Sequence, residues 1–234
     1  MNTTRRFESS TFYKFIERAS PIDKQIVICG LGGIGSNTFY NISKSLPNSN
    51  ITLIDFDLVE EHNIGTQYFT NRDLNMFKTN ALKNKAENFK GVIETISMEI
   101  NEYNSIPVLN NNLITIACFD NMEARTNLFN IWRKNTNSNK IFIEGRLAAT
   151  QYEIYSVLSG REEEYVNSLF KDDEITLGKL CTFQQTAHYG MAIGSRITQI
   201  ICNHLSNIYH NEKMYRIPFY YREIGDLFNI TIKD

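Results

Sequence analysis

The stretch that decides the fold runs from Gln25 to Lys78 and begins QIVICGLGGIGSNTFYNISKSL. The apolar run QIVIC predicts a short buried strand, and the glycine-rich residues after it predict a tight turn into a helix. The glycines are Gly30, Gly32, Gly33 and Gly35. Such a turn leaves room for a phosphate group at the helix N-terminus, where free N–H groups favour an anion. The glycine pattern alone is weak evidence for a nucleotide site.

An acidic pair after the next apolar run strengthens that evidence. Asp55 ends the run 51–55 and lies about 20 residues beyond the last glycine, where dinucleotide-binding folds place an acid that hydrogen-bonds a ribose. Asp57 follows two positions later and either assists Asp55 or caps a turn. Together, the glycine turn and Asp55 predict a nucleotide site.

The rest of the chain alternates between strand and helix patterns. Apolar or β-branched runs at 92–98, 113–119 and 140–144 predict strands, and helical spacing predicts helices over 78–89 and 121–134. This alternation is typical of an α/β, Rossmann-like fold, in which a mostly parallel sheet carries helices on both faces.

The pattern changes after Arg146. Residues 151–158 alternate and predict an antiparallel strand, paired with the final run 228–232. The polar stretch 160–180 predicts an exposed crossover, and 184–208 predicts a long helix with small residues that suit close contact with a sheet or another subunit. We therefore expect an antiparallel C-terminal extension within one domain over 25–234, with a nucleotide-binding part at 25–150 and a crossover and C-terminal part at 151–234. Residues 1–24 predict a separate N-terminal helical segment.

Composition excludes several classes of protein. The net charge of −2 gives no basic field for nucleic acid, and the 4 cysteines form no CxxC pair, which argues against disulfides and a zinc site. No apolar run approaches 18 residues, and the first residues lack a signal core. We expect a soluble, cytoplasmic protein without a membrane partner.

Further polar residues distinguish between nucleotide chemistries. Asn63, Gln67 and Lys78 follow the acidic pair, and the buried run 113–119 leads into Asp120 and Asn121, with Arg125 one helical turn on. Parallel strands bind ligands at their carboxyl ends, so these groups should meet the glycine turn in one crevice. An NAD(P)-binding oxidoreductase, the less favoured alternative, has no evident use for Lys78 or Asp120. An adenylating enzyme uses a lysine against phosphate charge and an aspartate to hold Mg²⁺.

The order of these motifs resembles the ThiF/MoeB/HesA superfamily, the adenylating cores of ubiquitin-activating enzymes. The matching motifs are GxGGxG at 30–35, DxDxV at 55–59, then Asn63, Gln67, Lys78, and Asp120-Asn121 with Arg125. The branch found on plasmids and phages is similar in its later CT dipeptide and small-residue helix. The resemblance covers residues 25–130.

The resemblance implies a reaction of ATP with the C-terminal carboxylate of a ubiquitin-like or sulfur-carrier protein, or of a peptide. The products would be an acyl-adenylate and pyrophosphate. Asp55 would bind the ribose, Asn63 and Lys78 the phosphates, and Asp120 a Mg²⁺ ion. Family members are commonly dimers, so a homodimer is expected.

One position departs from the family pattern. Thr66 stands where the family has an arginine that helps to neutralise the triphosphate. Arg72, Lys83 and Arg146 are candidates to replace it. Without a replacement, the chain would be a catalytically degenerate partner subunit.

Cys181, followed by Thr182, lies ahead of the predicted helix 184–208. In thioester-forming relatives a CT dipeptide occupies this place, and a thiolate at a helix N-terminus has a lowered pKa and attacks the adenylate. The alternative is a buried cysteine that packs against the helix.

Overall fold

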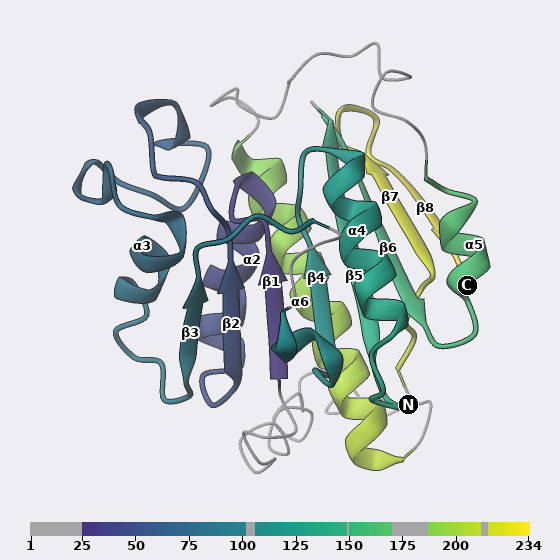
Figure 1. Cartoon of the computed structure of the whole chain (residues 1–234). Helices are drawn as coiled ribbons and strands as arrows, with labels where there is room; N and C mark the ends of the chain where they lie inside the picture. The colour runs from purple at the N-terminus through teal and green to yellow at the C-terminus, as the bar shows by residue number, and fades with distance from the viewer. Residues whose placement is uncertain (1–24, 102–105, 149, 170–186, 212–214) are drawn as a thin grey trace, which may run out of the picture.

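The structure of the chain, a computed structural model, describes residues 25–101, 106–148, 150–169, 187–211 and 215–234 (Figure 1). These residues form one eight-stranded sheet in the order β3-β2-β1-β4-β5-β6-β7-β8. Its parallel part consists of β1 (Gln25–Cys29), β2 (Asn50–Ile54), β3 (Ile93–Ile96), β4 (Ile114–Ala117) and β5 (Ile141–Ala148). Three antiparallel strands follow, β6 (Gln151–Leu158), β7 (Tyr220–Ile224) and β8 (Asn229–Lys233). The predicted fold class is confirmed.

Helices cover both faces of the sheet. One face carries α2 (Gly33–Ser45), α3 (Lys78–Asn84) and α6 (Ala187–His210), and the other carries α4 (Met122–Arg133) and the short α5 (Glu162–Val166). Figure 1 shows α4 in front of the sheet and α2 and α6 behind it. Strand β4 and all of β1 except Gln25 are buried on both faces, which is why their sequences are mainly apolar. No helix in the described part of the chain is long and apolar enough to cross a bilayer.

Two glycines in α6 let this helix lie directly against α2. A Cβ atom on Gly190 would lie 2.9 Å from the carbonyl oxygen of Gly33, and one on Gly194 would lie 2.8 Å from the backbone nitrogen of Thr38. Both distances are shorter than real Cβ contacts allow. Gly190 and Gly194 therefore serve the packing of α6 on α2, the helix that follows the glycine turn.

The structure corrects the predicted pairing of the C-terminal strands. Strand β6 pairs with β5 and with β7, a strand that the sequence analysis did not predict. Among the described residues, β8 pairs only with β7. The turn η9 (Gly225–Leu227) and Phe228, which has a φ of 48°, join β7 to β8. A connection this short places consecutive strands side by side, so β8 cannot reach β6.

Two boundaries also differ from the prediction. Helix α3 ends at Asn84 instead of residue 89, because Ala86 and Phe89 reach the core from a turn in which the Phe89 N–H donates to the Ala86 carbonyl. Strand β5 extends to Ala148, since its antiparallel partner β6 continues the ladder. The predicted helix over 1–24 and most of the crossover lie outside the described residues, and the domain division stays a prediction.

Candidate nucleotide site

The glycine turn has a backbone that only glycine adopts without strain. Gly30 has a φ of 82°, its N–H donates to the Ile54 carbonyl at 2.9 Å, and a Cβ atom there would lie 2.8 Å from the Cys118 carbonyl oxygen. A Cβ atom on Gly35 would lie 1.9 Å from the carbonyl oxygen of Gly30. The turn therefore joins β1, β2 and β4 at their carboxyl ends.

The N-terminus of α2 is open toward this edge of the sheet. Gly32 is the N-cap residue and supplies no side-chain cap, and a Cβ atom on Gly33 would meet no atom of the described residues within 4 Å. The first N–H groups of a helix have no partner within it, and the helix dipole favours negative charge there. The open space and the free donors fit a phosphate group.

Asp55 lies beside the turn and is almost completely buried, with 8% of its surface exposed. Its carboxylate accepts hydrogen bonds from the backbone N–H groups of Leu31 at 2.6 Å and Asp57 at 2.8 Å. Burial raises the pKa of Asp55, although Lys78 and the two N–H donors oppose the rise. A carboxylate has about four lone-pair positions, so acceptors remain for ribose hydroxyls.

Lys78 is the first residue of α3, and its ammonium group contacts Asp57. The distance between Nζ and Oδ2 of Asp57 is 2.7 Å, and the Lys78 N–H also donates to the Asp57 carbonyl at 2.9 Å. Lys78 is buried, whereas 46% of the Asp57 side chain is exposed. Asp57 thus holds a buried cation near Asp55.

Asn63, Thr66 and Gln67 form the loop that follows. Asn63 is buried in η3 (Glu61–Asn63), where its Oδ1 accepts the Glu60 N–H at 2.9 Å. The side-chain nitrogen of Gln67 lies 4.0 Å from where a Cβ atom of Gly32 would be, so Gln67 reaches the glycine turn. Its Oε1 is buried without a hydrogen-bond partner in the described structure. Thr66 is buried, and its hydroxyl donates to the Asn63 carbonyl at 3.4 Å, so this position carries no cation.

The turn after β4 presents Asp120 to solvent. Asn121 is the N-cap of α4, and its Oδ1 accepts the Ala124 N–H at 2.8 Å. Arg125 is buried, and its guanidinium donates to the Phe119 carbonyl through Nε at 3.2 Å and through a second nitrogen. Of these polar residues, Asp120 is exposed without a described side-chain role in the fold, whereas Asn121 and Arg125 stabilise the turn.

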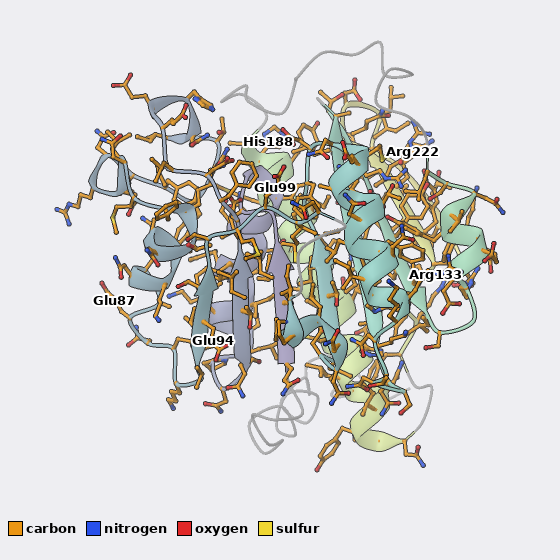
Figure 2. All side chains as sticks on the ribbon, viewed as in Figure 1. Glu87, Glu94, Glu99, Arg133, His188 and Arg222 are labelled. Atoms are coloured by element: carbon orange, nitrogen blue, oxygen red, sulfur yellow. The ribbon has the colours of Figure 1, made fainter. Side chains whose placement is uncertain are left out.

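The strand register brings these residues together. Cys29 is paired with Ile54 on one side and Ala117 on the other, so the residues that follow the three strands leave the sheet at one edge. In Figure 2, the labelled Glu99 and His188 lie toward this edge and Glu94 toward the opposite one. The glycine turn, Asp55 and Asp120 therefore share the carboxyl edge of the sheet.

A comparison with protein-family models identifies the family of the chain. The model of the family described as "ThiF family" matches residues 19–223. The chain belongs to the ThiF family. The comparison with curated proteins gives no match.

Solved structures with the same fold include MccB and PaaA. The chain is 17% identical to E. coli MccB solved with ATP, with a TM-score of 0.68 over 96% of this chain and 66% of that chain. MccB with AMPCPP and SeMet MccA gives the same values. PaaA is 16% identical, with a TM-score of 0.67 over 100% of this chain and 85% of that chain. The ThiF-family chain spans about two thirds of the length of the MccB chains, and at these identities the likeness shows the fold alone.

A buried charged group that the sequence did not reveal lies next to the candidate site. Glu144 on β5 is fully buried and accepts from Arg146 at 2.6 and 2.9 Å and from the Tyr165 hydroxyl at 2.6 Å. Arg125 contacts its Oε1 at 3.0 Å. Burial opposes ionisation, but Arg125, Arg146 and Tyr165 outweigh it and hold the pKa of Glu144 below its usual value. A glutamate within the apolar run IFIEG was the available signal, because buried charges need partners.

The contacts of Arg146 in this cluster affect its use as a substitute for the family arginine that is Thr66 here. Arg146 is committed to Glu144 and also donates to the Ser168 carbonyl at 3.2 Å, whereas Arg72 and Lys83 are exposed. Cys181 lies outside the described residues.

No group of three or more metal-ligating side chains occurs in the described ranges. Mg²⁺ in nucleotide sites takes one or two carboxylates together with phosphate oxygens and waters, and the exposed Asp120 fits that requirement.

Proposed function

We propose that this ThiF-family chain is an ATP-dependent adenylating enzyme that activates the C-terminal carboxylate of a small protein or peptide. The observation that carries the proposal is the meeting of an uncapped helix N-terminus, two carboxylates and a buried ammonium group at one edge of the sheet. An oxidoreductase needs the first two features, but hydride transfer has no use for Lys78 beside them. The proposal is supported by the structural neighbours, since E. coli MccB was solved with ATP and with AMPCPP and MccA.

Each residue would have a distinct role in the reaction. The free N–H groups of α2 receive the phosphates, and ribose hydroxyls donate to Asp55. The substrate carboxylate attacks the α-phosphorus, the bond to the pyrophosphate oxygen breaks, and pyrophosphate leaves with the electron pair. Lys78 neutralises charge on that leaving group, and Gln67 and Asn63 complete the loop beside it. Asp120 would hold Mg²⁺, which supplies further neutralisation of the phosphates.

The substrate would be a ubiquitin-like or sulfur-carrier protein or a peptide. The peptide alternative is favoured by the MccA complexes of MccB. The enzyme would act in the cytoplasm, where ATP is available, as a homodimer. A second candidate, a catalytically degenerate partner subunit, is favoured by the buried, uncharged Thr66.

ATP–pyrophosphate exchange tests the main proposal. Purified protein is incubated with ATP, labelled pyrophosphate and candidate carboxylate substrates, either peptides or small proteins that end in Gly-Gly. Substrate-dependent exchange that Asp120→Ala abolishes supports the proposal, and the matched control Glu123→Ala, which changes an exposed acid in the first turn of α4, should retain it. ATP binding without exchange for any substrate would instead support the degenerate partner, and a substrate-dependent change in nicotinamide absorbance would support an oxidoreductase.

Cys181 is tested separately. If its thiol accepts the acyl group, the carrier forms a covalent adduct with the enzyme that dithiothreitol removes. Cys181→Ala should then abolish the adduct while exchange continues, since adenylation precedes the transfer. An adduct that persists in this variant would exclude the thioester role.

A further inference from the structure

The buried cluster around Glu144 lies next to the turn that carries Asp120, and no step proposed above uses it. Glu144 is fully buried, and its two oxygens accept hydrogen bonds or ion contacts from Arg125, Arg146 and Tyr165. A buried ion cluster is costly to desolvate and is weak evidence for stability alone. Stability alone therefore does not account for the cluster, and the backbone that it holds in place indicates its role.

Arg125 connects the cluster to the Asp120 turn. Two of its nitrogens donate to the carbonyl oxygen of Phe119, the residue directly before Asp120, and its Nη1 lies 3.0 Å from Oε1 of Glu144. A guanidinium is planar, so fixing one edge on Glu144 fixes the other edge on the Phe119 carbonyl. The direction in which the chain leaves β4, and with it the position of Asp120, thus depends on Glu144.

The other side of the cluster is equally constrained. Arg146 donates to Glu144 in a bidentate pair, donates to Ser168 and lies 4.4 Å from the Tyr155 ring centroid. Tyr165 is buried on α5 and donates its hydroxyl to Glu144. Glu144 is therefore held by two elements outside the Asp120 turn, β5 and α5, and does not move with that turn.

We propose that Glu144 is a positioning residue for Asp120, acting through Arg125 and the Phe119 carbonyl. The proposal rests on the adenylating function proposed above. Positioning partners of this kind typically contribute 10- to 100-fold to metal affinity or activity. Glu144 touches no substrate, so it should affect turnover more than ATP binding.

The kinetic test compares Glu144→Gln with Lys140→Met, a buried residue that directly precedes β5 and contacts the C-terminal end of α4, the end away from the Asp120 turn. Glu144→Gln should lower kcat of pyrophosphate exchange about 10- to 100-fold with the KM for ATP almost unchanged, and Lys140→Met should leave both unchanged in the folded protein. In an Asp120→Asn background, Glu144→Gln should have almost no further effect, because it acts through Asp120. Additive losses, or an equal loss in Lys140→Met, would overturn the proposal.

Hydrogen–deuterium exchange gives a readout that does not need activity. Glu144→Gln should speed exchange in the peptide 119–126, which includes the Ala124 N–H held by Asn121, whereas Lys140→Met should speed it near 130–134 at the other end of α4. Unchanged exchange in 119–126 would refute the positioning role. If the wild type binds no ATP yet the peptide responds, the proposed function fails and the positioning of the turn stands.

Glu144→Gln leaves two buried arginines without an anion, and this variant could fail to fold. A milder variant is therefore tested as well. Tyr165→Phe removes one hydrogen bond to Glu144 and keeps the aromatic packing. We expect a loss of about 3-fold in kcat and a smaller change in the same peptide. An unchanged kcat and unchanged exchange in this folded variant would also overturn the proposal.

Discussion

At the amino edge of the parallel sheet, Lys140 donates hydrogen bonds to the carbonyl oxygens of Trp132, Arg133 and Asn135 at 2.8 to 3.1 Å. At the carboxyl edge, Lys78 contacts one half-exposed carboxylate, Asp57. Both ammonium groups are buried, but the Lys140 group caps the C-terminus of α4 and donates to three carbonyl oxygens, whereas the Lys78 group donates to one carboxylate within the described structure.

Some other polar groups of the two edges show the same difference, although Ser49 Oγ and Trp132 Nε1 near the amino edge are also buried without a hydrogen-bond partner in the described structure. At the amino edge, His204 contacts the Asn139 carbonyl at 2.7 Å, and Asn135 donates to Asn112 at 2.8 and 2.9 Å. At the carboxyl edge, Asp120 is exposed and the Gln67 Oε1 has no partner among the described residues. The amino edge serves stability, and the unused hydrogen-bonding capacity of the carboxyl edge is what a ligand requires.

The largest effect should come from Lys78. Lys78→Met keeps the buried chain length but removes the cation, so we expect about a 1000-fold loss in kcat/KM for pyrophosphate exchange, equivalent to about 4 kcal/mol. Lys85→Met, which breaks the nearby Lys85–Asp73 contact of 2.7 Å, is the matched control and should stay within a few-fold of the wild type. Equal losses in the two variants would remove Lys78 from the chemistry.

The equivalent change at the amino edge should affect stability instead. Lys140→Met leaves the last carbonyls of α4 without their donor, and we expect the free energy of unfolding to fall by about 3 kcal/mol. Denaturant titration measures this loss, and exchange kinetics of the folded protein should not change. A kinetic defect larger than 3-fold would contradict the separation of the two edges.

His204 gives the amino edge a pH dependence. Burial lowers the pKa of His204 to about 4, with the contact to Asn139 opposing the shift. Between pH 6.5 and 4 the unfolded chain binds a proton at His204 that the folded chain does not, so stability falls as pH falls through this window. We expect about 2 kcal/mol of this loss between pH 7 and 5, measured by denaturant titration. His204→Gln keeps a donor for Asn139 and should remove this part of the pH dependence.

The smallest effects should come from a pair of glycines. Gly194→Ala places a Cβ atom 2.8 Å from the Thr38 nitrogen, forces α2 and α6 apart and should cost about 1.5 kcal/mol of stability. In the described part of the chain, the Cβ atom of Gly33→Ala meets no atom within 4 Å, and the substitution should raise stability by about 0.5 kcal/mol. Its methyl group enters the space assigned to the phosphates, so ATP affinity measured by calorimetry should fall about 10-fold. If ATP binding is weaker in Gly194→Ala and unchanged in Gly33→Ala, the space beside Gly33 does not receive the phosphates.

Sequence patterns predicted most of the parallel fold because each pattern is local. The run 113–119 contains β4, buried on both faces, and the glycine cluster contains a turn whose Gly30 has a positive φ. The partner of an edge strand is not local, so the pairing of β8 with β7 was missed. The helix predicted over 78–89 ends at Asn84 in the structure. Ala86 and Phe89 pack against the core from the turn that follows, so their apolar spacing did not indicate a helix.

The sequence by itself determined the glycine turn, the acid at the end of β2 and the order of the motifs that places the chain in the ThiF family. Only the tertiary structure decided which charges are already paired. Arg125 proves to be bound to Glu144 and the Phe119 carbonyl, Lys78 to Asp57, and Arg146 to Glu144. The physical reason is that a backbone turn is specified by adjacent residues, whereas an ion pair is chosen by whichever opposite charge the fold brings within about 4 Å.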